Sequence, residues 1–167
     1  MSVREISLFG DPVLVSRADE VTAFDAKLGH LVDDMLETMD AAGGVGLAAN
    51  QVGVLQRVFV YDCDDRRGEL INPRWEPVGD ETEVDDEGCL SIPGINAATE
   101  RFLRVRATGQ DRTGTPVTLE AEGLLARCIQ HETDHLDGVL FLKRLQPEAR
   151  KAAMRELRSA DWFLAGK

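Results

Sequence analysis

The sequence predicts an α+β fold, in which helices pack against antiparallel or mixed strands. Three stretches have the apolar spacing of helices, and several shorter ones have the alternation or apolar runs of strands. Along the chain these elements follow one another as a helix, a group of strands and two further helices. The chain has 167 residues, enough to bury its own core, so we expect one domain spanning residues 1–167.

The composition excludes some classes of function. A formal net charge of −11 argues against a nucleic-acid-binding surface, which needs a basic patch, so we expect no DNA partner. No apolar run is long enough to span a bilayer, and the first residues lack the apolar stretch of a signal peptide. Three cysteines at irregular spacing fit a reducing cytoplasm. A monomer is the default expectation.

The first helix follows a turn at residues 10–12. Gly43 and Gly44 end it, because glycine readily takes the left-handed conformation of a helix C-terminus. A loop or strand is expected next. The apolar residues of this helix recur at helical spacing and form one buried stripe: Leu28, Leu31, Val32, Met35, Leu36 and Met39.

Strands are predicted in the middle of the chain. Residues 57–62 are predicted to form a buried strand, and residues 69–73 a short one that Pro73 stops. A polar loop is expected between them at 63–68. The acidic stretch 79–87 is predicted to be a solvated loop.

A hairpin and two helices complete the chain. Residues 102–111 and 116–123 alternate polar and apolar side chains, which predicts two strands joined by a turn at 112–114. A helix is predicted over 122–136. The last helix is predicted over 147–160, since the proline at its start suits a first helical turn.

The helix over 122–136 carries the pattern HETDH. His131 and His135 are about one helical turn apart, so both imidazoles project from one face and can bind one metal ion. Glu132 can reach a water on that metal. The chain has three histidines, and two of them stand in this pattern, which favours a metal site over a chance pair. We expect His30 to be structural.

The third ligand has two candidates. Glu156 follows His135 by 21 residues, about where a thermolysin-like zinc peptidase supplies a glutamate. Cys89 follows a glycine and precedes a turn, where a thiolate is accessible to a metal, although most cytoplasmic cysteines are buried and inert. Spacing alone leaves the two close to a tie.

Three short motifs together resemble the signatures of the peptide deformylase family. GVGLAANQ (residues 44–51), EGCLS (87–91) and QHETDHLDG (130–138) occur in the family's order and at family-like separations. The likeness covers nearly the whole chain. It implies that antiparallel or mixed sheets pack around a central helix carrying HETDH, with a further helix near the C-terminus.

The resemblance implies a metal-dependent hydrolase that removes the N-terminal formyl group from formyl-methionyl nascent polypeptides and releases formate. Its metal ligands would be Cys89, His131 and His135, which leaves an open position for water, as a catalytic site requires. The metal would be Fe(II), as is common in deformylases of this kind, with Zn, Ni or Co as alternatives. Ligand softness alone favours zinc.

The same resemblance implies roles for residues near the metal. Glu132 would take a proton from the attacking water as general base and pass it to the leaving amine. The side chain of Gln51 and the backbone N–H of Leu90 would stabilise the developing oxyanion. The residues that would contact the substrate are Val45, Gly46, Leu90, Leu124 and Cys128. Without the resemblance, Leu124 and Cys128 would be interpreted as core residues of the helix.

Some residues depart from the family pattern. Arg127 stands one helical turn before His131, where an aliphatic residue is common, and residues 94–99 lack a basic residue that some members carry. The preference beyond the substrate's methionine is therefore open. Glu87 and Arg101 have opposite charge and are predicted to pair and brace the segment that carries the cysteine.

Two other functions are alternatives to a deformylase. An HExxH peptidase would use Glu156 as its third ligand. A non-enzymatic module would hold a structural metal, with Cys63 or Cys128 as a fourth protein ligand. Against this module, the residues expected of a catalytic site are all present.

Basic residues are concentrated near the C-terminus of this acidic chain. A solvated helix face that packs on its own domain is the simpler explanation from composition. Because deformylases act on nascent chains, the segment is also a candidate contact with ribosomal RNA. These residues are Lys143, Arg144, Arg150, Lys151, Arg155 and Arg158.

Overall fold

The computed structural model describes residues 2–166, so the first and last residues of the predicted domain lie outside the described residues. The α-helices are α1 (Ala26–Ala42), α2 (Leu124–Leu136), α3 (Pro147–Arg158) and α4 (Asp161–Ala165). The strands are β1 (Gly46–Ala48), β2 (Val58–Cys63), β3 (Arg66–Pro77), β4 (Thr82–Cys89), β5 (Ile92–Phe102), β6 (Arg104–Gln110) and β7 (Pro116–Glu122). Short 3-10 helices are η1 (Pro12–Val15), η2 (Ala49–Val52) and η3 (Phe141–Arg144).

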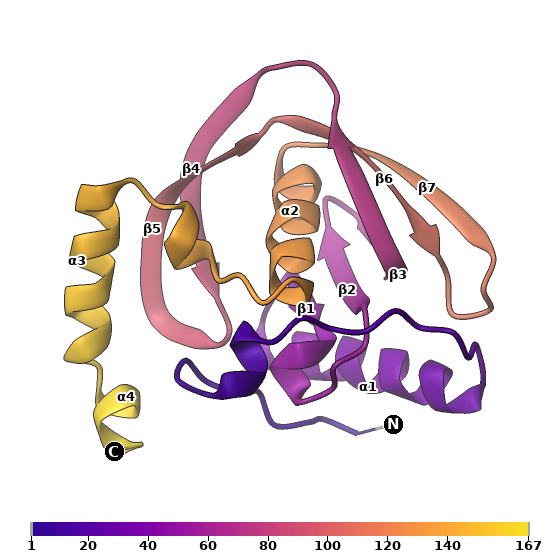
Figure 1. Ribbon diagram of the computed structural model, residues 1–167, viewed down its shortest axis with the longest axis horizontal. Coiled ribbons are helices and arrows are strands. Elements are labelled where there is room, and N and C mark those ends of the chain that lie inside the picture. Colours follow the sequence, from indigo (N-terminus) through magenta and orange to yellow (C-terminus); the bar gives the residue numbers. More distant parts are fainter. Residues whose placement is uncertain (1, 167) are drawn as a thin grey trace.

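The strands form two separate antiparallel sheets. One has five strands in the order β1-β2-β3-β6-β7, and the other is a two-stranded ribbon of β4 and β5. In Figure 1 the ribbon curves along one side of α2, and the five-stranded sheet lies on the other side. Helix α3 lies against the outer side of β5.

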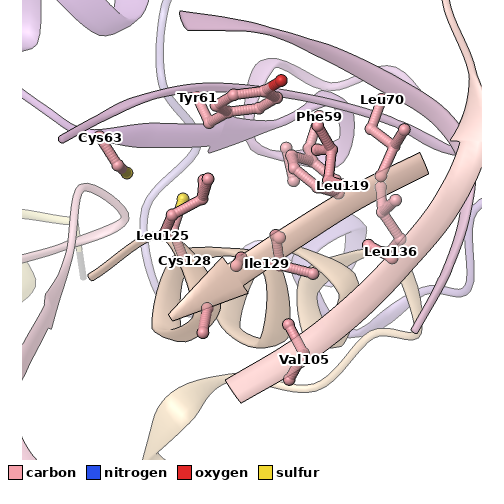
Figure 2. Packing of buried hydrophobic residues seen from close by; sticks show 14 of the residues in the cluster. Phe59, Tyr61, Cys63, Leu70, Val105, Leu119, Leu125, Cys128, Ile129 and Leu136 are labelled. Atoms are coloured by element: carbon pink, nitrogen blue, oxygen red, sulfur yellow. The ribbon is translucent and has the colours of Figure 1, made fainter. Parts of the chain in front are cut away.

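Helix α2 is the centre of the fold. Residues 125–136 are buried, and the helix contacts strands of both sheets. On its apolar side, Leu125 and Ile129 pack in one cluster with Phe59 and Leu70 of the large sheet (Figure 2). An α+β fold with antiparallel sheets and a C-terminal helix is therefore confirmed, and HETDH lies on the central helix.

Strand β2 is buried on both faces because a helix covers each side of it. Phe59 and Tyr61 belong to the cluster around α2, whereas Val58 and Val60 pack with α1. Successive side chains of a strand point to opposite faces, so a strand between two helices is apolar throughout. This arrangement confirms the buried strand predicted over 57–62.

Helix α1 begins and ends with the expected signals. The side chain of Asp25 accepts the backbone N–H of Leu28 at 3.1 Å, which caps the first turn. Gly43 ends the helix with a φ of 70°, a left-handed conformation that glycine adopts without strain. The prediction for this helix is confirmed.

The prediction of a loop over the acidic stretch 79–87 was wrong, because most of it forms β4. Residues 82–86 are exposed in this strand. Because these five residues are exposed on both faces of the strand, they need no alternation of polar and apolar side chains, and the stretch carried no strand signal.

Strand β3 is longer than predicted. It begins at Arg66, so most of the loop predicted at 63–68 is strand, and it continues through Pro73 to Pro77. The pairing with β6 shifts between Ile71 and Arg74, and this irregularity accommodates the missing N–H of the proline.

The remaining boundaries differ by small amounts. The predicted hairpin is present as β6 and β7, and α2 begins at Leu124 rather than at residue 122. The last helix ends at Arg158 and is followed by α4, while Lys143 and Arg144 lie in η3 rather than in that helix. Among residues 2–166, no helix is long and apolar enough to cross a membrane.

Candidate metal centre and active site

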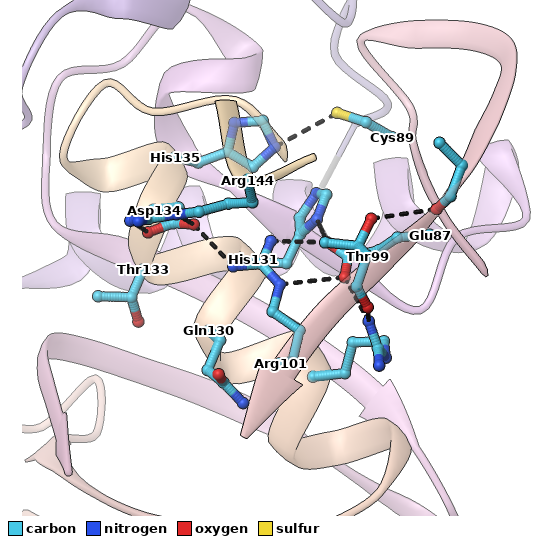
Figure 3. Close-up of polar contacts among 12 residues, drawn as sticks. Glu87, Cys89, Thr99, Arg101, Gln130, His131, Thr133, Asp134, His135 and Arg144 are labelled. Carbon is cyan, nitrogen blue, oxygen red and sulfur yellow. Dashed lines mark hydrogen bonds and ion pairs between the residues drawn. The ribbon is translucent and has the colours of Figure 1, made fainter. Parts of the chain in front are cut away.

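Three side chains meet where the end of β4 approaches α2. Cys89, His131 and His135 each offer a ligand atom within 4.8 Å of the other two, and Sγ of Cys89 lies 3.3 Å from Nε2 of His135. Figure 3 shows the thiol of Cys89 facing the imidazole of His135, with His131 nearby. One soft sulfur and two imidazoles form a donor set that fits a divalent transition metal.

The imidazole of His131 is oriented by a buried carboxylate. Its Nδ1 lies 2.6 Å from Oε1 of Glu87, which leaves Nε2 available to a metal. Arg101 binds the same carboxylate through two hydrogen bonds of 2.7 and 3.0 Å. Burial opposes ionisation of Glu87, but hydrogen bonds from His131 and Arg101 lower its pKa well below the usual range. The predicted pairing of Glu87 with Arg101 is confirmed, and the pair is buried.

His135 is the most deeply buried of the three. Burial lowers its pKa well below the usual range, so the imidazole is neutral, which is the form that binds metals. Its Nδ1 is buried and has no hydrogen-bond partner among residues 2–166. The side chain of Asn50 donates to its backbone oxygen and ties η2 to the end of α2.

Glu132 is a buried carboxylate with an unpaired oxygen. Its Oε1 has no hydrogen-bond partner in the described part of the chain. Burial raises the pKa of Glu132 to about 7, against the opposing charge of His131. A carboxyl group that titrates near neutral pH can both accept and release a proton during a reaction.

Gln51 and Leu90 lie beside the three candidate ligands. The Gln51 side chain is held at both ends, because Oε1 accepts the N–H of Ala48 at 3.0 Å and Nε2 donates to Oγ of Ser91 at 3.1 Å. Nε2 is also 3.7 Å from Sγ of Cys89. Leu90 lies in the turn between β4 and β5.

A cavity of about 580 Å³ opens beside these groups. It is bordered by Gln51, Cys89, His131 and Glu132, whereas His135 does not line it. Val45 and Leu124 are exposed at the cavity, and Cys128 is buried against it. All five residues predicted to contact substrate line this cavity: Val45, Gly46, Leu90, Leu124 and Cys128.

The other candidate ligands do not join this group. Glu156 is exposed on α3, and the one cluster of possible metal ligands among residues 2–166 does not include it. Cys63 and Cys128 are buried and direct their sulfurs at the backbone oxygen of Val45, at 3.4 and 3.7 Å. The geometry thus favours Cys89 over Glu156 as the third ligand. Neither Cys63 nor Cys128 is placed to be a fourth ligand.

Sequence reasoning missed several residues that support the site. Ser91 holds the amide of Gln51, and Asn50 holds the end of α2, but nothing in the sequence around these short polar residues signals their partners. Arg127, noted only as a departure from the family pattern, is buried and bonded to Glu87.

The chain matches a known protein family over most of its length. The family described as polypeptide deformylase matches residues 3–151. The chain belongs to the polypeptide deformylase family. Peptide deformylase 1 of Corynebacterium efficiens is 63% identical over 167 residues, which cover 98% of this chain and 99% of the relative. Peptide deformylase 1 of Corynebacterium glutamicum is 64% identical over the same length and coverage.

Solved deformylases have the same fold. A peptide deformylase from Legionella pneumophila is 38% identical, with a TM-score of 0.89 and coverage of 99% of both chains. Another from Synechococcus elongatus, in complex with actinonin, is 39% identical with a TM-score of 0.88, covering 96% of this chain and 90% of its own.

Membership of the deformylase family establishes the function. The protein is a hydrolase that removes the N-terminal formyl group from nascent polypeptides, and its family depends on a metal. A peptidase and a non-enzymatic module, the two alternatives considered from the sequence, are thereby overturned.

Gly46 of β1 passes so close to Glu132 that a side chain does not fit between them. A Cβ at this position would lie 2.5 Å from Oε2 of Glu132 and 2.6 Å from Sγ of Cys128. We expect Gly46→Ala to displace Glu132 and to lower kcat/KM for deformylation by about 100-fold, since a shift of about 1 Å can have that effect. Gly29→Ala in α1, where a Cβ meets nothing within 4 Å, is the control and should leave kcat/KM unchanged.

Proposed function

We propose that Cys89, His131 and His135 hold the metal of this deformylase and that Glu132 is its general base and acid. The proposal is supported by the converging ligand atoms and by the contact of Glu87 with His131, which leaves Nε2 of that imidazole free. A divalent metal held there would lower the pKa of a water and polarise the formyl oxygen.

Glu132 moves the proton in this proposal. Its carboxylate accepts a proton from the attacking water and delivers it to the nitrogen of the leaving amine. The buried Oε1 supports this role, because no hydrogen bond from the described residues occupies it. A pKa near 7 also lets one group act as base and then as acid at neutral pH.

Gln51 and Leu90 stabilise the negative charge that develops on the formyl oxygen. The amide of Gln51 is fixed by Ala48 and Ser91, so its N–H groups are oriented before substrate arrives. The backbone N–H of Leu90 is the second donor. Donors that are fixed in advance stabilise charge as it appears, without a cost of reorientation.

The substrate's methionine side chain occupies the cavity beside these groups. We propose that it contacts the side chains of Val45, Leu90, Leu124 and Cys128 and the backbone of Gly46, which line the cavity. A flexible thioether fits an irregular apolar wall well. The family's natural substrates, N-formyl-methionyl peptides and nascent chains, carry this side chain.

Fe(II) is the proposed metal. The donor set of one thiol and two imidazoles also suits zinc, nickel and cobalt, and zinc would bind more tightly than iron. We retain iron because the resemblance to deformylases implies it. An iron enzyme with a thiolate ligand should lose activity in air, since the thiolate is the form of cysteine that oxidises.

We propose a monomer with one catalytic domain, acting in the bacterial cytoplasm on chains that leave the ribosome. Helix α3 is the proposed contact with ribosomal RNA, because four exposed basic residues outnumber its two acidic ones: Arg150, Lys151, Arg155 and Arg158. We leave Arg144 out of this contact, because its guanidinium already binds Asp134 at 2.8 Å.

Formate release from N-formyl-Met-Ala-Ser tests the proposed function. The protein is purified without oxygen, stripped of metal and reloaded separately with Fe(II), Ni(II), Co(II) and Zn(II). We expect formate from the iron, nickel and cobalt forms, little from the zinc form, and rapid loss of the iron activity in air. Equal activity without added metal, or cleavage of the Met-Ala bond, would contradict the proposal.

A further inference from the structure

The proposed metal site is divided between two parts of the fold that share no strand pairing. Cys89 comes from the end of β4, whereas His131 and His135 come from α2. The β4-β5 ribbon is not hydrogen-bonded into the five-stranded sheet. Because an isolated two-stranded ribbon is only marginally stable, side-chain contacts must fix the ribbon against α2.

Arg127 makes such contacts from the helix. Its NH1 donates to Oε2 of Glu87 and to the backbone oxygen of Thr99, each at 2.8 Å, and its NH2 donates to the backbone oxygen of Glu83 at 2.9 Å. Glu83 and Glu87 belong to β4 and Thr99 to β5, so one guanidinium binds both strands of the ribbon.

Arg101 makes the reciprocal contact from the ribbon. Its NH1 reaches Asp134 of α2 at 2.8 Å, while its Nε and NH2 hold Glu87 (Figure 3). Arg127 lies one turn before His131 on α2 and is 6% exposed, so little water competes for its hydrogen bonds. The two arginines thus join the ribbon and the helix on either side of Glu87, the residue that orients His131.

We propose that Arg127 is a positioning residue, which fixes the ribbon carrying Cys89 to the helix carrying both histidines and so assembles the metal site before metal binds. This inference rests on the proposed ligand set. Arg127 acts through Glu87 and through two backbone oxygens of the ribbon, and it touches none of the three ligands in the contacts described.

Removing the guanidinium tests this role through metal affinity. In Arg127→Met, which keeps much of the side-chain volume, we expect the dissociation constants for Zn(II) and Co(II) to rise about 10–100-fold, as on loss of other groups that orient metal ligands. The ligand-field absorption of bound Co(II) should shift, and amide hydrogen exchange should accelerate across residues 82–102. Arg66→Met, which removes an exposed arginine bonded to the backbone oxygen of Glu120, is the matched control and should change none of these.

If Arg127 only stabilised the fold, the measurements would give a different result. In that case Arg127→Met lowers the unfolding midpoint but leaves the dissociation constants and the Co(II) spectrum of the folded protein unchanged, and this outcome overturns the inference. Arg127→Lys serves as a second variant if the methionine protein does not fold. One ammonium group cannot contact all three acceptors, so we expect weakened metal binding there too, and wild-type affinity would also overturn the inference. Failure of the wild-type protein to bind metal would instead contradict the proposed function.

Discussion

Replacing Glu132 with glutamine is expected to lower kcat for formate release by about 10²–10⁴-fold. Glutamine has nearly the same shape as glutamate but cannot accept the proton of the attacking water. The Oε1 atom of Glu132 is buried and has no hydrogen-bond partner among residues 2–166, so it is free to accept that proton. Metal content should stay at the wild-type level, since Glu132 is not among the three residues that converge as ligands.

The metal measurement separates a chemical effect from a structural one. Formate release and metal content should be determined on the same anaerobic preparation. Glu122→Gln, an exposed glutamate paired with Arg104 at the surface, is the control and should retain full activity. A Glu132→Gln protein that keeps its metal and more than a tenth of wild-type kcat would show that another group moves the proton.

Replacing Cys89 with serine is expected to weaken metal binding strongly. The effect should exceed that of a substitution at any residue other than His131 and His135. A serine hydroxyl is neutral and hard, so it is a poor substitute for a thiolate on a transition metal. The dissociation constant should rise by more than the roughly 10–100-fold seen when an orienting partner is lost. Deformylase activity should be lost with the metal, as measured by competition with a coloured chelator and by formate release.

Glu156→Gln is the matched comparison for that ligand assignment. If Cys89 is the third ligand, the Glu156 variant binds metal as the wild type does, because Glu156 is exposed on α3 and outside the cluster. Loss of metal from the Glu156 variant, with retention in Cys89→Ser, would reverse the assignment.

The helical part of the site could be predicted from spacing. His131, Glu132 and His135 lie within four positions of one another on one helix, so local geometry alone brings them together. Cys89 could not be derived in this way, because it reaches the histidines only through the path of the β4-β5 ribbon. The resemblance between motifs supplied that step, and the structure supports it with a Cys89 to His135 distance of 3.3 Å.

The ribbon itself was the largest error of the sequence prediction. Its first strand is acidic and exposed over residues 82–86, so neither alternation nor an apolar run marked it. Arg127 was unexplained for a related reason. Its partners Glu83, Glu87 and Thr99 are 28 to 44 positions away along the chain, and no local pattern connects them.

X-ray absorption at the metal edge of the iron-loaded protein tests the central assignment most directly, because it counts the ligand atoms by type. We expect one sulfur and two imidazole nitrogens, with lighter atoms completing the shell, and loss of the sulfur in Cys89→Ser. A site with two sulfurs would indicate that Cys63 or Cys128 also binds the metal. A wild-type site without sulfur would contradict the assignment of Cys89.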